Sequence, residues 1–275
     1  MAKTKAVAKK TIFPLGPHPL PPHPCGIHLA ATDQNTVHAV PHRVLDDGPL
    51  QPAQFTAAMA QWIVTHHVRP EAVERDRIRR EALARQDLVD PVQRLPINMS
   101  TQKGNWAEIL LAEYVAASSA AQLPVYRLRY NPNVDQSMKG DDVLAFDLDS
   151  NPVRVIVGEA KFRSTPSKAV VEELVDALVR SHSGNIPASL QFVADVLFET
   201  GNNELGEKVA ACNALFAQGR LRLDYIGLLV STRNAHQYVQ MNAKTDVRRL
   251  AVMSLGLADP VGVVTASYAG AGAQI

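Results

Sequence analysis

The chain of 275 residues has few cysteines, almost no net charge and no long apolar run. Its two cysteines, Cys25 and Cys212, lie far apart and match no zinc or redox spacing, so we expect a reducing, cytoplasmic environment. No run reaches the roughly 18 apolar residues that a membrane helix requires. The basic segment at residues 1–10 has no apolar core after it, which argues against a secretory signal.

The charge balance and the missing motifs exclude several classes of function. The formal net charge is +1, so no chain-wide positive field indicates nucleic acid, and any such contact must be local. No G-x-G-x-x-G follows an expected strand, and the segment at residues 178–185 is not a phosphate loop. A nucleophile elbow for Ser/His/Asp catalysis is also missing. These absences argue against a phosphate-handling metabolic enzyme and a serine hydrolase.

Residues 1–50 are rich in proline and histidine, and we expect them to form an N-terminal arm. Proline at this density prevents helices and central strands, so the arm should be extended or loop-like. His18, His23, His28 and Cys25 could suggest a metal, but their spacing fits no tetrahedral motif. We therefore expect a proline-rich arm without a metal site.

Residues 51–97 are predicted to be helical. Apolar residues recur at helical intervals after Pro52, and a second charged helix is expected to reach about Leu88. His66 and His67 are expected to be structural or exposed. The arginines of the second helix could touch phosphate, but a solvated face with acid–base pairs is the favoured interpretation. These arginines are Arg75, Arg77, Arg79, Arg80 and Arg85.

Residues 98–275 are predicted to form one ordered α/β domain without internal repeats. The helix over residues 101–122 is apolar nearly all round, so it should pack on more than one side. The order of elements predicts a mixed α/β sandwich. The other expected elements are strands at 123–130, 141–148, 153–162 and 221–232, helices at 167–182 and twice within 187–217, and a helix or strand in the tail to Ile275.

The two strands around the turn "DSNP" should form a hairpin. A turn centred between Ser150 and Asn151 places Asp142 opposite Glu159, where antiparallel partners stand about 4.5–5.5 Å apart. The neighbouring Asp141 would then lie on the other face of the sheet. Both faces of the second strand are largely apolar, which is typical of a central strand covered on both sides.

The acids and the lysine at the end of this hairpin indicate a metal site. Two facing carboxylates repel each other, and Mg²⁺ with its oxygen ligands would hold them together. Lys161 lies on the same face as Glu159, roughly 7 Å along the strand, where its ammonium could orient a water or offset negative charge. The alternative is a plain surface ion pair between Glu159 and Lys161, with Asp142 as a turn or cap residue.

These residues, in this order, resemble the PD-(D/E)xK nuclease superfamily. Its members carry an Asp at the start of the second core strand and a (D/E)-x-K at the end of the third, here Asp142 and Glu159 with Lys161. Many members also carry a Glu on the preceding helix, for which "GNWAEILLAEY" offers Glu108, with Glu113 as the poorer candidate. The resemblance implies a restriction-endonuclease-like core, a mixed sheet flanked by helices.

The longer string over residues 98–182 is similar to the nuclease component of Hachiman-type bacterial antiviral systems, which works with a helicase. This resemblance implies a nuclease dependent on Mg²⁺ or Mn²⁺, with DNA as the favoured substrate and a helicase subunit as partner. The residues themselves do not distinguish DNA from RNA. A near-neutral chain should bind nucleic acid weakly and rely on that partner for delivery. The alternative is a non-catalytic interaction or sensing module with a nuclease fold, in which Lys161→Ala leaves function intact.

The resemblance also implies a role for each site residue. Asp142, Glu159 and the carbonyl of Ala160 would hold the metal, with Glu108 beside or behind them. Lys161 would orient the attacking water or stabilise the transition state. Arg163, one step further along the same face, is either a contact to a neighbouring phosphate or a solvated arginine. Because the motif here is Gly-Asp-Asp, the choice between Asp141 and Asp142 as metal ligand stays open.

Overall fold

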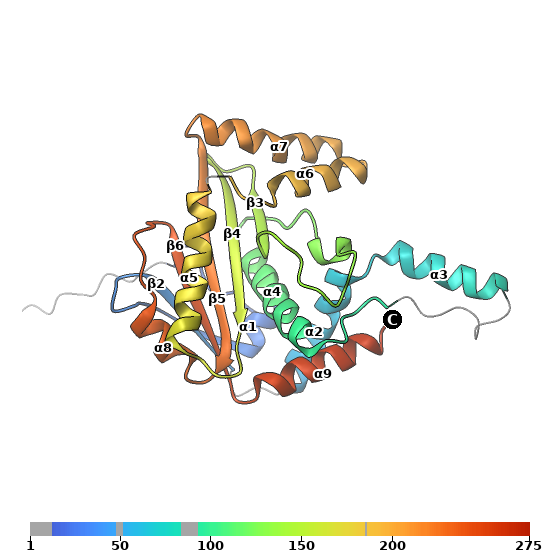
Figure 1. Ribbon diagram of the computed structural model, residues 1–275, viewed down its shortest axis with the longest axis horizontal. Helices are drawn as coiled ribbons and strands as arrows, with labels where there is room; N and C mark the ends of the chain where they lie inside the picture. Colours follow the sequence, from blue (N-terminus) through green and yellow to red (C-terminus); the bar gives the residue numbers. More distant parts are fainter. Residues whose placement is uncertain (1–12, 48–51, 84–92, 185) are drawn as a thin grey trace, which may run out of the picture.

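The computed structural model describes residues 13–47, 52–83, 93–184 and 186–275 (Figure 1). Its centre is a six-stranded mixed sheet with the strand order β1-β2-β6-β5-β4-β3. Strands β2, β6, β5 and β4 run parallel, and the two edge strands β1 and β3 are antiparallel to their neighbours. The strands are β1 (Leu29–Asn35), β2 (Pro41–Asp47), β3 (Val143–Asp147), β4 (Val153–Phe162), β5 (Leu221–Thr232) and β6 (Leu250–Leu257).

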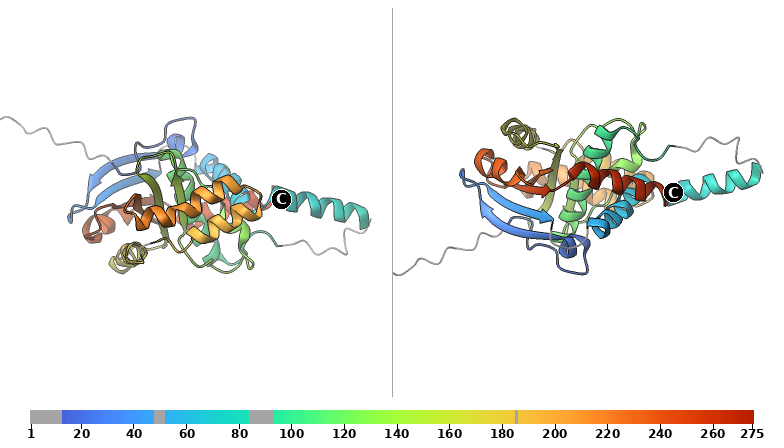
Figure 2. Two further views of the ribbon diagram at one scale, coloured as in Figure 1. Left: turned by 90° about the horizontal axis from the view of Figure 1, so that it is seen from above. Right: turned by 90° about the horizontal axis from the view of Figure 1, so that it is seen from below.

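Helices cover both faces of this sheet, so the protein is a mixed α/β fold. The apolar side chains of α1, α2, α4 and α9 pack on one face, and those of α5, α6, α7 and α8 pack on the other. Helix α3 projects away from the body (Figures 1 and 2). The helices are α1 (Pro24–His28), α2 (Pro52–His67), α3 (Pro70–Leu83), α4 (Met99–Ser118), α5 (Lys168–Ser183), α6 (Leu190–Glu199), α7 (Asn203–Ala217), α8 (Ala235–Asn242) and α9 (Pro260–Gly272).

Strand β4 lies inside the sheet and is covered on both faces, as its sequence predicts. On β4, Val155 and Val157 point to the α5 face, while Ile156 and Phe162 join the core under α4. Gly158 allows α4 to approach closely, because a Cβ there would lie 2.9 Å from Leu111 Cδ2. The predictions of strands at 153–162 and 221–232 are confirmed.

The helices that flank the hairpin both begin at a side chain that caps them. Asn98 caps α4 by accepting a hydrogen bond from the Ser100 amide, and Ser167 caps α5 by accepting one from Val170. Helix α4 ends at Ser118, slightly earlier than predicted. Both helices expected within 187–217 are present as α6 and α7. The tail contains both a strand and helices, β6 with α8 and α9.

The expectation of an extended or loop-like arm over residues 1–50 is wrong for residues 24–47. These residues form α1 and two strands, and β2 pairs in parallel with β6 inside the sheet. The prolines concentrate before residue 25, and Pro41 is the first residue of β2, where a missing amide donor is tolerated. The first twelve residues lie outside the described part of the chain.

The predicted strand at residues 123–130 is also wrong. Only Gln122 forms a bridge, with Phe146 on β3, and Arg127–Tyr130 form the 3₁₀ helix η2. Pro124 cannot donate to a ladder, which explains why pairing stops there. In the helical region, α2 and α3 match the prediction up to Leu83, while Arg85 and the expected end near Leu88 lie outside the described residues.

His66 and His67 are both buried, which agrees with a structural role. None of the helices in the described ranges is long and apolar enough to cross a membrane.

Candidate functional site

The predicted hairpin register is confirmed. Val143 on β3 lies opposite Gly158 on β4, so Asp142, immediately before β3, stands at the position that faces Glu159. Strand β4 continues to Phe162, whereas the ladder with β3 stops at Val143. The last four residues of β4 therefore have a free edge on the β3 side, and the site lies at this edge.

Asp142 occupies the start of this free edge. Its Oδ2 accepts a hydrogen bond of 2.8 Å from the backbone N–H of Ala160. In a strand, the N–H and C=O of one residue point to the same side, so the carbonyl of Ala160 faces the same edge as Asp142. A carboxylate and a backbone carbonyl oxygen are thus presented together.

Asp141 has a different role. Its carboxylate accepts hydrogen bonds from Ser181 Oγ at 3.0 Å and from the Ser189 N–H at 3.1 Å. Its own N–H donates to Ser189 Oγ at 2.9 Å. These bonds tie the start of β3 to α5 and to the residue before α6. Asp141 is therefore an anchor of the strand, and its neighbour Asp142 is the aspartate presented to the site.

A cleft of about 590 Å³ opens over the free edge of β4 and extends to the first turns of α4. It brings together every residue predicted for the site. Its lining includes Ser100, Lys103, Asn105, Glu108, Asp142, Glu159, Ala160, Lys161 and Arg163. Neither Asp141 nor Glu113 is among the lining residues.

Glu108 lies at the buried end of the cleft and pairs with an arginine that the sequence did not reveal. Arg127 Nε lies 3.4 Å from Glu108 Oε1. The guanidinium of Arg127 also donates to the backbone carbonyls of Met138 and Asp141, so it joins η2 to the loop before β3. Glu113, the poorer candidate, bonds His66 Nε2 at 2.7 Å instead.

Lys161 is held by two acids. Its Nζ lies 2.8 Å from Glu159 Oε1 and 3.3 Å from Glu173 Oε1 on α5. Although burial lowers the pKa of Lys161, the bonds to the two carboxylates outweigh it, and the pKa is raised overall. The lysine is therefore a cation at neutral pH. Arg163 also pairs with Glu173, at 3.0 Å.

The side chains of Glu159 and Lys161 are 18% and 20% exposed, so their pair is not a freely solvated surface pair. An exposed pair of this kind would contribute little. Here the two side chains line a cleft that also contains the buried carboxylate of Glu108, and the partly buried setting makes their electrostatic coupling stronger.

Burial and mutual repulsion favour the protonated forms of two acids in the cleft, Glu108 and Asp142. Burial raises the pKa of Glu108 to about 8, and the charges of Asp142 and Glu159 add to this against the opposing effect of Arg127. Burial, followed by the charge of Glu159, raises the pKa of Asp142 to about 7. Raised pKa values of this kind cluster at functional sites.

The donor atoms of the cleft fit a hard divalent cation. As the side chains stand, no three His, Cys, Asp or Glu residues in the described ranges gather around a common point. Glu159 and Glu108 face Lys161 and Arg127 instead. The available donors are carboxylate oxygens and the Ala160 carbonyl, the oxygen set that Mg²⁺ and Mn²⁺ take. A cation would also favour the ionised forms of Asp142 and Glu108, whose pKa values burial and then neighbouring carboxylates raise.

Asn105 is a second residue that the sequence analysis missed. It is buried, it lines the cleft, and it lies one helical turn before Glu108 on α4. Its Nδ2 has no hydrogen-bond partner within the described part of the chain. Its spacing of three residues from Glu108, which places both side chains on one face of the helix, was the signal in the sequence that could have found it. A buried amide that lacks a protein partner is suited to bind a ligand in the cleft.

Glu108 makes the stability of the metal-free protein depend on pH. The folded protein keeps the Glu108 proton up to about pH 8, whereas the unfolded chain loses it near the ordinary pKa of 4.5. The contribution of protonated Glu108 to the free energy of unfolding is therefore complete below pH 4.5 and is lost as the pH rises to about 8. The difference is at most about 5 kcal/mol. In EDTA, we expect Glu108→Gln to be more stable than the wild type at pH 8.5 and equally stable at pH 4.5.

Thermal unfolding of both proteins across this pH range checks the prediction. The glutamine keeps the shape of the side chain and a partner for Arg127, so the difference between the two proteins isolates the ionisation of Glu108. A difference in melting temperature that stays constant with pH would contradict the raised pKa.

Two comparisons place the chain among known proteins. Residues 25–255, which include the whole cleft, match the HamA family. The Hachiman protein HamA of Bacillus cereus is 36% identical over 230 residues, which cover 82% of this chain and 83% of that protein. The chain therefore belongs to the HamA family.

Proposed function

We propose that this protein is a metal-dependent nuclease of the PD-(D/E)xK type that hydrolyses phosphodiester bonds in DNA. The observation that carries the proposal is the free edge of β4, where Asp142, Glu159, the Ala160 carbonyl and Lys161 line one cleft. The order α4, β3, β4, α5, β5 is compatible with a restriction-endonuclease-like core.

Asp142, Glu159 and the carbonyl of Ala160 would hold Mg²⁺ or Mn²⁺, with Glu108 beside or behind them. Such an ion, when bound, activates a water and screens the charge of the phosphate. The Ala160 N–H fixes the Asp142 carboxylate in place. Lys161 stays protonated through its acids, so it can orient the attacking water and stabilise negative charge as it develops. Asn105 would donate to a phosphate oxygen or to a water in the cleft.

We propose further that the nuclease acts in antiviral defence together with a helicase. The resemblance of residues 98–182 to the nuclease of Hachiman-type systems supports this, as does the 36% identity to a Hachiman protein. The net charge of +1 also fits a nuclease that a partner delivers to its substrate, since affinity for nucleic acid scales with the phosphates neutralised.

Cleavage assays test the proposal directly. Supercoiled, linear and single-stranded DNA, and RNA, are incubated with the protein in Mg²⁺, in Mn²⁺ or in EDTA, with and without a candidate helicase from a neighbouring gene. We expect DNA cleavage that requires the metal and increases with the helicase. If no nucleic acid is cut under any of these conditions, the protein is not a nuclease, and a non-catalytic interaction module becomes the better explanation.

The two neighbouring aspartates should respond differently to the same substitution. Asp142→Asn removes the anionic oxygen at the free edge of β4 and should abolish metal-dependent cleavage while the protein stays folded, because burial already favours the neutral form. Asp141→Asn weakens the bonds to Ser181 and Ser189, so it should lower the melting temperature and leave cleavage by the folded protein measurable. Loss of cleavage in Asp141→Asn alone would reassign the metal ligand.

A further inference from the structure

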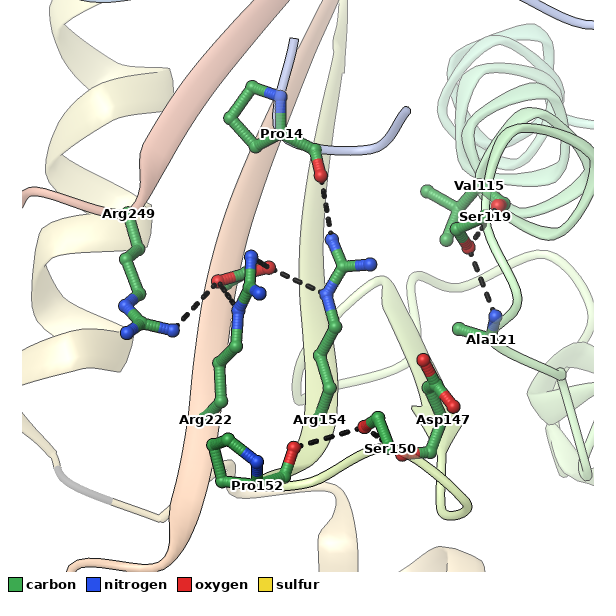
Figure 3. A network of polar contacts seen from close by, with 11 residues as sticks. Pro14, Val115, Ser119, Ala121, Asp147, Ser150, Pro152, Arg154, Arg222 and Arg249 are labelled. Atoms are coloured by element: carbon green, nitrogen blue, oxygen red, sulfur yellow. Dashed lines mark hydrogen bonds and ion pairs between the residues drawn. The ribbon is translucent and has the colours of Figure 1, made fainter. Parts of the chain in front are cut away.

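Three arginines converge on one carboxylate at the end of the sheet opposite to the cleft (Figure 3). Arg154 Nε donates to Asp224 Oδ2 at 2.6 Å, and Arg222 donates to both Asp224 oxygens at 3.0 and 2.8 Å. Arg249, immediately before β6, lies at 3.7 Å. Asp224 is fully buried. The cluster therefore contains three positive charges and one negative charge.

The surplus charge lies on the exposed side of this cluster. The Arg249 side chain is 53% exposed and lies too far from Asp224 for a strong hydrogen bond. Arg222 is partly exposed, while the Arg154 side chain is 11% exposed and also donates to the carbonyl of Pro14. Arg248, the residue before Arg249, pairs with none of the residues that the structure describes. Arg222, Arg248 and Arg249 are thus available to an anion.

These three arginines line a cavity of about 780 Å³. It lies at the start of β4 and β5, where Val153 pairs with Leu221. The acids of the catalytic cleft lie about six residues further along β4, roughly 20 Å away. Asp246 is the one acid among the residues that line the cavity. The cavity is therefore separate from the cleft and has a basic edge.

Most of the remaining lining is apolar or aromatic. Phe216 at the end of α7, Leu223 on β5 and His182 near the end of α5 contribute to it. Tyr225 also lines the cavity, and its buried hydroxyl has no hydrogen-bond partner among the described residues. Cavities of about 300–1,000 Å³ with apolar walls and a few polar groups are typical of small-molecule sites.

We propose that this cavity binds a nucleotide through its phosphate, either as a free nucleoside phosphate or as the end of a nucleic-acid strand. The guanidinium groups of Arg248 and Arg249 bind phosphate oxygens in the planar, bidentate geometry that suits them. The base packs against the apolar wall that contains Phe216. The site is not catalytic, and its existence does not depend on nuclease activity in the cleft.

Isothermal titration calorimetry on the full chain in EDTA at low salt tests the proposal. The probes are ATP, inorganic pyrophosphate, adenosine and a 5′-phosphorylated tetrathymidylate. Arg248→Gln/Arg249→Gln removes two exposed charges and leaves Asp224 paired with Arg154 and Arg222, so the protein should fold. Arg75→Gln/Arg79→Gln removes two exposed charges from α3 and serves as the matched control.

We expect ATP or the oligonucleotide to bind the wild type and the control equally, and the Arg248/Arg249 variant at least tenfold more weakly. Added salt should weaken binding, and adenosine should not bind. The tighter of the two binding probes identifies the source of the phosphate. Equal affinities of the Arg248/Arg249 variant and the control would overturn the proposal, as would a lack of binding by every phosphate probe. Because cleavage is not measured, failure here leaves the proposed nuclease function untouched.

Discussion

Glu159→Gln and Lys161→Ala should each reduce metal-dependent DNA cleavage by a factor of about 10²–10⁴. Glu159 supplies one of the facing carboxylates of the cleft, and a neutral amide in its place binds a divalent cation poorly. Lys161 is the cation that the acids hold protonated beside the free edge of β4. The measurement is the initial rate of nicking of supercoiled DNA in Mg²⁺.

The control for these two substitutions is Lys168→Ala. Lys168 is also a lysine near the cleft end of the sheet, but its side chain is 69% exposed and, among the described residues, pairs only with Glu172 on its own helix, at 3.5 Å. Its loss should leave the rate within about a factor of two, because exposed pairs of this kind contribute little. Equal rates in the wild type and all three variants would mean that the chemistry, if any, lies elsewhere.

The hairpin was predictable from the sequence because its information is local. One turn between two apolar strands fixes the register, and the register alone brings Asp142 opposite Glu159. The cap residues Asn98 and Ser167 fix the starts of α4 and α5 in the same local way. The elements that carry the four acidic and basic site residues could therefore be placed without knowledge of the rest of the chain.

The N-terminal strands β1 and β2 form a local hairpin, but they were missed because β2 joins the sheet through a distant strand and its polar residues are buried. Strand β2 pairs with β6, more than 200 residues later in the chain. His42 and Arg43 on β2 are both almost fully buried, which breaks the apolar pattern of a central strand. Arg43 is accommodated by Asp33 on β1, at 2.6 Å, and this partner is visible only in three dimensions.

Arg127 and Asn105 were missed for a related reason. Arg127 lies in a segment that was predicted to be a strand, and its contact with Glu108 depends on the 3₁₀ turn that replaces that strand. Asn105 lies on a helix that is apolar nearly all round, so its position in the cleft is set by how α4 packs against β4. Residue type and spacing do not reveal such tertiary contacts.

Asp224→Ala should destabilise the protein by about 3–5 kcal/mol. The substitution removes the carboxylate that pairs with three arginines and leaves the largely buried guanidinium of Arg154 without this counter-charge. Removing one partner of a buried ion pair costs far more than the pair itself contributes, because the remaining charge stays desolvated. Urea unfolding followed by circular dichroism measures the free energy of unfolding.

Asp246→Ala is the matched control, since Asp246 is exposed, lines the same cavity and carries the same charge. Its effect should stay within about 0.5 kcal/mol. Combining Asp224→Ala with Arg154→Met should recover part of the loss, because the uncompensated buried charge is removed together with its partner. A loss below about 1 kcal/mol for Asp224→Ala would mean that solvent already compensates the arginines. In that case solvent would screen the positive charge of the arginines at this end of the sheet more than the burial of Asp224 implies.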